Sequence, residues 1–154
     1  VAASRRAREK GAFVIALVNN PGSSLAAVAD LEILVASGPE VIAGSTRLAA
    51  GTAQKAALNL LSTLTHIRLG AVHDGLMVNV ETGNAKLRKR AACIVAAIAR
   101  VDEATAHAAL DAAGGKVKPA VLLCAGAKDI AAAQRLLAAA NGNLRLAMSR
   151  LADT

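Results

Sequence analysis

Hydrophobic and polar positions fall into blocks along the chain, and the first blocks indicate an α/β arrangement. Residues 1–10 have a helical pattern that ends at Gly11. The continuous apolar runs 13–18 and 31–35 are typical of strands buried on both faces of a parallel sheet. Because helix, strand, short helix and strand follow in that order, we expect part of a parallel three-layer α/β/α domain.

Two strands are too few for an independent parallel sheet, and the opening helix of such a domain normally follows a strand. The chain also opens with Val1 and not with a methionine. We therefore expect the complete protein to carry an N-terminal half that lies before this sequence.

A long helix is predicted over residues 46–69, with Ser45 as its N-cap. Apolar residues recur along it at spacings of four and three and predict a buried stripe, which consists of Ala53, Ala57, Leu60, Leu64 and Ile67. Gly51 lies one turn into this helix, where glycine costs about 1 kcal/mol relative to alanine. Its presence suggests that another backbone or a ligand approaches closely.

The C-terminal third has the pattern of a compact helical module. We expect a short strand at 76–80, an amphipathic helix at 84–100, and helices that begin after Asp102 and Asp129. Residues 117–125 suit either a helix or a strand, and Pro119 near the start favours a helix. A last helix ends near residue 151, and we recognise no internal repeat.

The composition restricts the possible partners. The chain of 154 residues is 55% hydrophobic, carries a net charge of +7 and has one aromatic residue, Phe13. A basic chain suits a nucleic acid, an anionic membrane or a phosphorylated ligand. The lack of aromatic side chains argues against binding of single-stranded nucleic acid. We expect no nucleic-acid or membrane partner, and we interpret the basic run as a solvated helix face, which comprises Lys86, Arg88, Lys89 and Arg90.

Metal and cofactor chemistry has little support in the sequence. Cys93 and Cys124 have apolar neighbours, so we predict buried, unreactive thiols in a reducing cytosol. The histidines show no zinc-ligand spacing with cysteine or carboxylate residues; they are His66, His73 and His107. The eleven acidic residues form no obvious catalytic pair. We expect no metal, no cofactor and no catalytic residue in this chain.

The start of the long helix is the candidate binding site. Residues on one side of its first two turns, with two hydroxyls and the first-turn N–H groups, are suited to an anion; they are Ser45, Thr46, Arg47, Gln54 and Lys55. The alternative is a capped helix with a solvated basic start. Glu40 precedes this helix, and we favour a local structural role for it over catalysis.

One segment resembles a known family. Residues 38–55 read Gly-Pro-Glu-Val-Ile-Ala-Gly-Ser-Thr-Arg-Leu-Ala-Ala-Gly-Thr-Ala-Gln-Lys, which is similar to the signature of the N-acetylmuramic acid 6-phosphate etherases. The resemblance continues through 58–63, 76–80 and 84–87, the turn at 20–23, and Gly142 and Arg145. Ala49 departs from it, because the family usually has lysine there.

The resemblance implies a sugar isomerase (SIS) domain followed by a small helical cap. Residues 1–70 would be the C-terminal half of the SIS domain, 71–100 a connecting segment with the amphipathic helix, and 101–154 the cap. The family is cytoplasmic, homodimeric and independent of metals. As carbon–oxygen lyases, its members cleave the lactyl ether of a phosphorylated amino sugar during cell-wall recycling, giving N-acetylglucosamine 6-phosphate and D-lactate by elimination and hydration.

The resemblance also places the family's catalytic glutamates in the N-terminal half, before this sequence. We therefore expect the chain to be inactive alone and to contribute substrate-binding residues, namely Glu40, Ser45, Thr46, Arg47, Gln54 and Lys55. The alternative function is a non-catalytic SIS protein that binds a sugar phosphate and regulates another process. Paired glutamates upstream would favour the enzyme.

Overall fold

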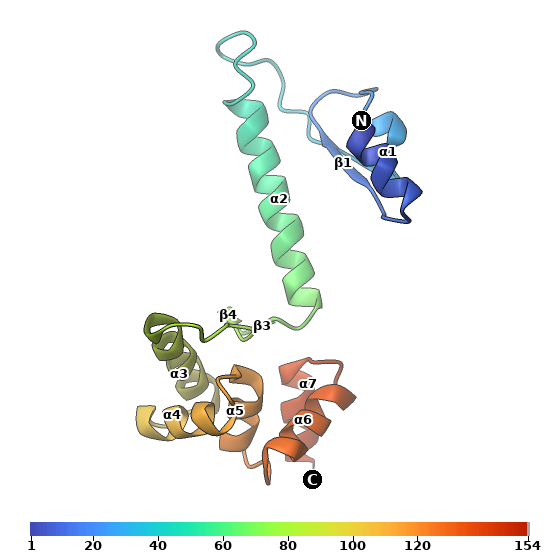
Figure 1. Cartoon of the computed structure of the whole chain (residues 1–154). Helices are drawn as coiled ribbons and strands as arrows, with labels where there is room; N and C mark the ends of the chain where they lie inside the picture. The colour runs from blue at the N-terminus through green and yellow to red at the C-terminus, as the bar shows by residue number, and fades with distance from the viewer. Residues whose placement is uncertain (154) are drawn as a thin grey trace. The chain divides into compact units, whose positions relative to one another are not determined.

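A computed structural model describes residues 1–153, and the chain divides into two compact units, residues 1–63 and 64–154 (Figure 1). The first unit combines helices with a small parallel sheet, and the second is mainly helical. The expected mixed α/β class is therefore confirmed. Among the described helices, none is both long and apolar enough to cross a membrane.

The first unit follows the expected order of elements. Helix α1 (Ala2–Glu9) precedes strand β1 (Ile15–Val18), a 3-10 helix η1 (Ala26–Val28) and strand β2 (Leu31–Leu34). Strands β1 and β2 pair in parallel, with Ile15 opposite Leu31 and Val18 opposite Leu34. The long helix α2 (Ala49–Arg68) begins in this unit.

The expected two-sided burial of the strands is wrong for this chain. Ala16 and Val18 are buried, whereas Ile15 and Leu31 are exposed, and Phe13 is 70% exposed. In the described part of residues 1–63, each strand has a single neighbouring strand, so one edge of each stays unpaired. The sequence pattern therefore describes a larger sheet than the one these residues form.

Helix α2 differs from the expectation at its start and along its apolar face. It begins at Ala49, and Ser45 lies in the preceding turn, where its carbonyl accepts from the Leu48 N–H at 3.1 Å. The predicted N-cap role of Ser45 is therefore wrong. Within 49–68 the structure buries Ala50 alone, while Leu60 is 63% exposed. The predicted stripe exists in the sequence, but no described element packs over it here.

The second unit opens with a small hairpin and continues as successive helices. Strand β3 (Val72–His73) pairs antiparallel with β4 (Leu76–Met77), which is shorter than the expected strand at 76–80. The helices are α3 (Ala85–Ala99), α4 (Glu103–Ala112), α5 (Val117–Cys124), α6 (Ile130–Ala139) and α7 (Leu144–Ala152). The helical interpretation of 117–125 is confirmed, as are the N-cap roles of Asp102 and Asp129.

The hydrophobic core lies in this second unit, where α3, α4 and α5 pack against one another. Leu110, Val121 and Leu122 are fully buried there. The four basic residues of α3 are exposed, as expected for a solvated face, and Arg88 pairs with Asp111. The prediction for Cys93 is wrong, because this residue lies on the exposed side of α3 despite its apolar sequence neighbours.

The second unit contains an internal repeat, which corrects the expectation that there is none. Helices α4 and α5 match α6 and α7 at an offset of 27 residues. In both copies an aspartate caps the first helix, an alanine in that helix has no exposed surface, and a glycine with positive φ forms the turn. The matching pairs are Asp102 and Asp129, Ala106 and Ala133, and Gly115 and Gly142. The repeat escapes notice in the sequence because most matched positions carry residues of different size or polarity, such as His107 and Gln134 or Leu122 and Ser149.

Candidate functional site

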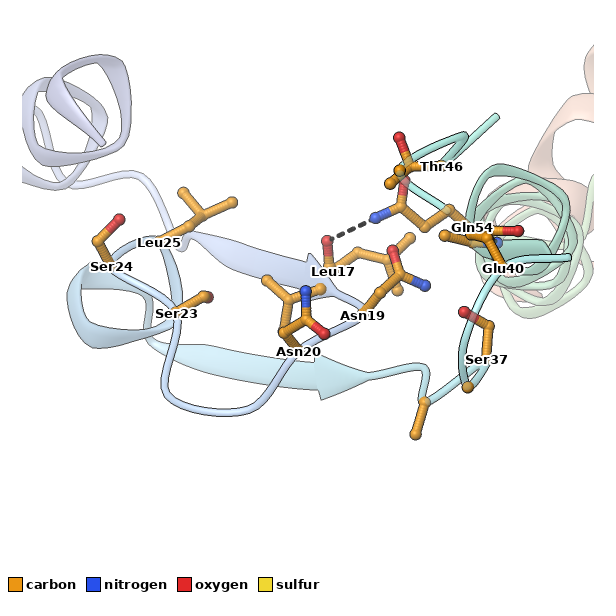
Figure 2. Close-up of a pocket in the computed structure, with 15 residues that line it drawn as sticks. Leu17, Asn19, Asn20, Ser23, Ser24, Leu25, Ser37, Glu40, Thr46 and Gln54 are labelled. Carbon is orange, nitrogen blue, oxygen red and sulfur yellow. Dashed lines mark hydrogen bonds between the residues drawn. The ribbon is translucent and has the colours of Figure 1, made fainter. Parts of the chain in front are cut away.

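A cleft of about 720 Å³ lies in the first unit, where the carboxyl ends of β1 and β2 approach the start of α2. Figure 2 shows amide and hydroxyl side chains around it, drawn from the loops after both strands and from α2. The polar residues that line it include Asn19, Asn20, Ser23, Ser37, Thr46 and Gln54. Ligands of open parallel sheets bind in a crevice of this kind, outside the carboxyl ends of the strands.

Glu40 caps α2 from the preceding loop. Its carboxylate accepts from the N–H groups of Ala49 at 2.8 Å and Ala50 at 2.9 Å. The Gly51 N–H donates to the Thr46 carbonyl at 2.8 Å. The first N–H groups of α2 are therefore satisfied within the chain, and the negative carboxylate sits where the helix dipole favours it. The structural role that we expected for Glu40 is confirmed by this cap.

The glycine near the start of α2 also has a structural explanation. A Cβ atom at Gly51 would lie 3.2 Å from the Thr46 carbonyl oxygen. Such a contact is tight, so a larger residue would have to displace the turn that precedes the helix. The close approach inferred from the sequence is thus a backbone approach within this loop, and it needs no ligand.

Two amide side chains connect the elements around the cleft. The side-chain amide of Gln54 donates to the Leu17 carbonyl at 3.4 Å, a long bond that joins α2 to β1 (Figure 2). The side-chain amide of Asn19 donates to the Val35 carbonyl at 2.9 Å and joins the ends of β1 and β2. These bonds hold the two strand ends and the helix together as one wall.

The structure brings together part of the predicted set. Glu40, Thr46 and Gln54 line the cleft. Ser45 is half-buried, and Arg47 and Lys55 are exposed; these three are not among the residues that line it. Among the described lining residues, Glu40 is the one charged side chain, and its carboxylate already binds two backbone N–H groups. The cleft therefore offers neutral donors and acceptors, which suit hydroxyl and amide groups of a ligand.

Sequence reasoning missed several lining residues. Asn19, Asn20 and Ser23 belong to the loop after β1, and Ser37 belongs to the loop after β2. The signal was present, because polar residues directly after two apolar runs of a parallel sheet meet at one sheet edge. The turn at 20–23 contributed to the family resemblance, but we did not predict that it lines a site.

Metal binding has no support in the geometry of the described residues. Within 1–153, no group of three histidine, cysteine, aspartate or glutamate residues is arranged to hold a metal ion. His73 lies 3.5 Å from the Asp74 carboxylate, and His107 lies 3.7 Å from that of Glu103. Each of these contacts joins one histidine to one carboxylate, so neither provides the three ligands of a metal site.

The similarity to known proteins covers nearly the whole chain. An N-acetylmuramic acid 6-phosphate etherase from Streptomyces coelicolor is 47% identical over 149 residues, 97% of this chain and 48% of that protein. The etherase from Klebsiella aerogenes is 46% identical over 149 residues, 97% of this chain and 50% of that protein. The etherase from Symbiobacterium thermophilum is 52% identical over 122 residues, 79% of this chain and 41% of that protein. No family model matches the sequence.

The chain is a relative of the N-acetylmuramic acid 6-phosphate etherases. The resemblance read from residues 38–55 is thereby confirmed. The chain spans about half the length of the etherases that it matches. The cleft, the Glu40 cap and the Gln54 bond all belong to this half.

Proposed function

We propose that this chain is part of an etherase that acts on N-acetylmuramic acid 6-phosphate, and that it supplies a sugar-binding wall of the active site. The similarity to the etherases over 97% of the chain carries this proposal. The neutral cleft supports it, because amide and hydroxyl side chains at strand ends are suited to the hydroxyl and N-acetyl groups of an amino sugar.

The acid and the base of the reaction belong, on this proposal, to the other half of the protein. Elimination needs one group to take a proton from the carbon acid and another to protonate the departing lactyl oxygen. Glu40 is the one carboxylate of the described cleft lining, and both its oxygens accept from the start of α2. A carboxylate whose two oxygens both cap α2 has a structural role, and we assign it no part in proton transfer. The chain alone should therefore have no etherase activity.

We assign the remaining predicted residues to the phosphate side of the same site. Arg47 and Lys55 are exposed beside Thr46 and Gln54, which line the cleft, so they offer positive charge at its border. Ser45 lies in the same turn. From the resemblance to the etherases we also propose that the whole protein is a cytoplasmic homodimer that uses no metal or cofactor.

Complementation tests the proposal. The purified chain is assayed for lactate release from N-acetylmuramic acid 6-phosphate, alone and after mixing with the separately expressed N-terminal half of a related etherase. We expect turnover in the mixture only. Turnover by the chain alone would refute the division of roles, and Glu40→Gln would then be the first variant to examine. Binding of the sugar phosphate by the mixture without turnover would favour the regulatory alternative.

The role of Arg47 is tested in the complemented enzyme. Losing a charge-assisted contact of ~1.5–3 kcal/mol predicts that Arg47→Ala weakens substrate binding or turnover roughly tenfold to a hundredfold. Arg5→Ala, at an exposed residue of α1, is the matched control and should leave the kinetics unchanged. Equal kinetics for the two variants would remove Arg47 from the site.

A further inference from the structure

The two sides of the Asn19 amide group have different surroundings. Its side-chain N–H donates to the Val35 carbonyl at 2.9 Å, and the Val35 N–H donates to the Val18 carbonyl at 2.7 Å. Both backbone groups of Val35 are therefore tied to the end of β1. Asn19 lines the cleft and Val35 does not. The nitrogen side of the amide is thus bonded to the end of the sheet, and its oxygen side is left to the cleft.

The bond to Val35 fixes the orientation of this amide. An amide turned end for end would place its oxygen against the Val35 carbonyl oxygen, and two acceptors share no hydrogen. Asn19 is half-buried, so water would compensate that pair poorly. Figure 2 shows the Asn19 oxygen on the side that faces Gln54. No hydrogen bond to this oxygen occurs within residues 1–153, so the cleft holds an acceptor of fixed direction that is unused.

The other groups of fixed polarity in the lining are also acceptors. Gln54 repeats the arrangement with a longer bond, because its amide N–H donates to the Leu17 carbonyl at 3.4 Å. Glu40 adds a carboxylate, and no lysine or arginine is among the described lining residues. The serine and threonine hydroxyls can donate or accept. A phosphate group would meet further acceptors beside Asn19, whereas a hydroxyl or an amide N–H supplies the missing hydrogen.

We propose that the Asn19 side-chain oxygen is a specificity-determining acceptor, which receives a hydrogen bond from a hydroxyl or an amide N–H of the ligand and keeps phosphate out of this part of the cleft. This role rests on the proposed function, because it takes the ligand to be a phosphorylated amino sugar. It adds the direction of one hydrogen bond, from ligand to protein. The phosphate then lies elsewhere in the site, in agreement with its assignment to the border at Arg47 and Lys55.

Analogues that lose one donor at a time test this role. N-acetylglucosamine 6-phosphate, a product of the proposed reaction, is titrated by calorimetry into the chain mixed with the N-terminal half of a related etherase. Three analogues carry fluorine in place of one of the free hydroxyls, and a fourth carries an ester oxygen in place of the amide N–H. We expect at least one analogue to bind about tenfold more weakly or worse, because it leaves a half-buried acceptor unpaired. That analogue identifies the donor as a hydroxyl or as the amide.

Two variants of Asn19 separate its acceptor from its bond to Val35. At neutral pH neither Asn19→Asp nor Asn19→Leu can donate to the Val35 carbonyl, but the aspartate keeps an acceptor and the leucine does not. The preference for the identified donor should persist in Asn19→Asp and vanish in Asn19→Leu. Asn59→Leu, at an exposed residue of α2 outside the cleft lining, is the matched control and should bind every ligand like the original chain. The analogue series with the original chain needs no variant, so it decides even where Asn19→Leu does not fold.

The outcomes separate this role from the proposed function. Equal affinities for all analogues, or a donor preference that Asn19→Leu keeps, would overturn the role of Asn19 and leave the proposed function intact. An equal loss of affinity for every ligand in both Asn19 variants would also overturn it, because Asn19 would then only support the loops. If the mixture binds none of the ligands, the proposed function and the role of Asn19 fail together.

Discussion

The two units of the chain differ sharply in how much of their apolar surface they bury. In the first unit, the buried apolar residues are Ala16, Val18 and Ala50, all small or medium in size. In the second, leucines and valines from successive helices form one core, in which Leu110 and Leu122 are fully buried. The candidate sugar cleft thus lies in the unit with the smaller core.

The difference has a simple physical origin. Each helix of the second unit packs against a sequence neighbour, and the repeat supplies the same packing twice. The first unit consists of one parallel strand pair with its flanking helices, and large apolar side chains on β1, β2 and α2 stay exposed. Exposed apolar area of this kind is typical of an interaction surface, and we infer that another part of the protein covers it. We therefore expect the second unit to fold independently and the first to need its missing half.

The largest expected effect comes from a matched pair of leucines. Leu122→Ala removes a fully buried side chain and should destabilise the second unit by ~2–5 kcal/mol. Leu60→Ala removes an exposed side chain of α2 and should change the stability of the isolated chain by less than about 0.5 kcal/mol. Urea unfolding followed by circular dichroism measures both.

The same pair tests whether a missing half covers α2. In a mixture with the N-terminal half of a related etherase, Leu60→Ala should weaken association, while Leu122→Ala should act on the stability of the second unit as before. If Leu60→Ala destabilised the isolated chain as strongly as Leu122→Ala, the contrast between the two units would be wrong.

The helix caps give an intermediate effect. Asp129 accepts from the Ala132 N–H at 2.7 Å and begins α6, so Asp129→Ala should destabilise the second unit by about 1 kcal/mol. Glu40→Ala removes the cap of α2 instead, and it should leave the cooperative transition of the second unit unchanged. Thermal unfolding of both variants measures this contrast, and equal shifts in the two would show that the units unfold together.

Local sequence patterns correctly predicted the features that depend on residues close together in the chain. The caps at Asp102 and Asp129, the parallel strand pair and the helix at 117–124 follow from turn, capping and periodicity rules. Burial was mispredicted for Phe13 and Leu60. The apolar pattern predicts that these side chains are covered, but nothing within residues 1–153 covers them. The start of α2 was misplaced because its cap, Glu40, comes from nine residues earlier and not from an adjacent hydroxyl.

The smallest expected effect is a loss of stability of the second unit in acid. An Arg145 hydrogen bond, followed by the charge of that guanidinium, lowers the pKa of Asp74 below its ordinary value of 3.8. A hydrogen bond from the Thr105 N–H lowers the pKa of Asp102 in the same direction. A carboxyl whose pKa is depressed on folding stabilises the fold above its unfolded pKa and loses that contribution as the pH falls through its folded pKa. The stabilising contribution of these two carboxyls should therefore be constant above about pH 5 and should fall progressively below about pH 4. Because both carboxyls are solvent-exposed, the decrease should be modest.

An NMR titration of the two carboxyls, together with unfolding at each pH, measures this decrease in stability. Arg145→Gln should raise the pKa of Asp74 towards its ordinary value and leave that of Asp102 unchanged. A titration of Asp74 identical in the variant and the original chain would contradict the role assigned to Arg145.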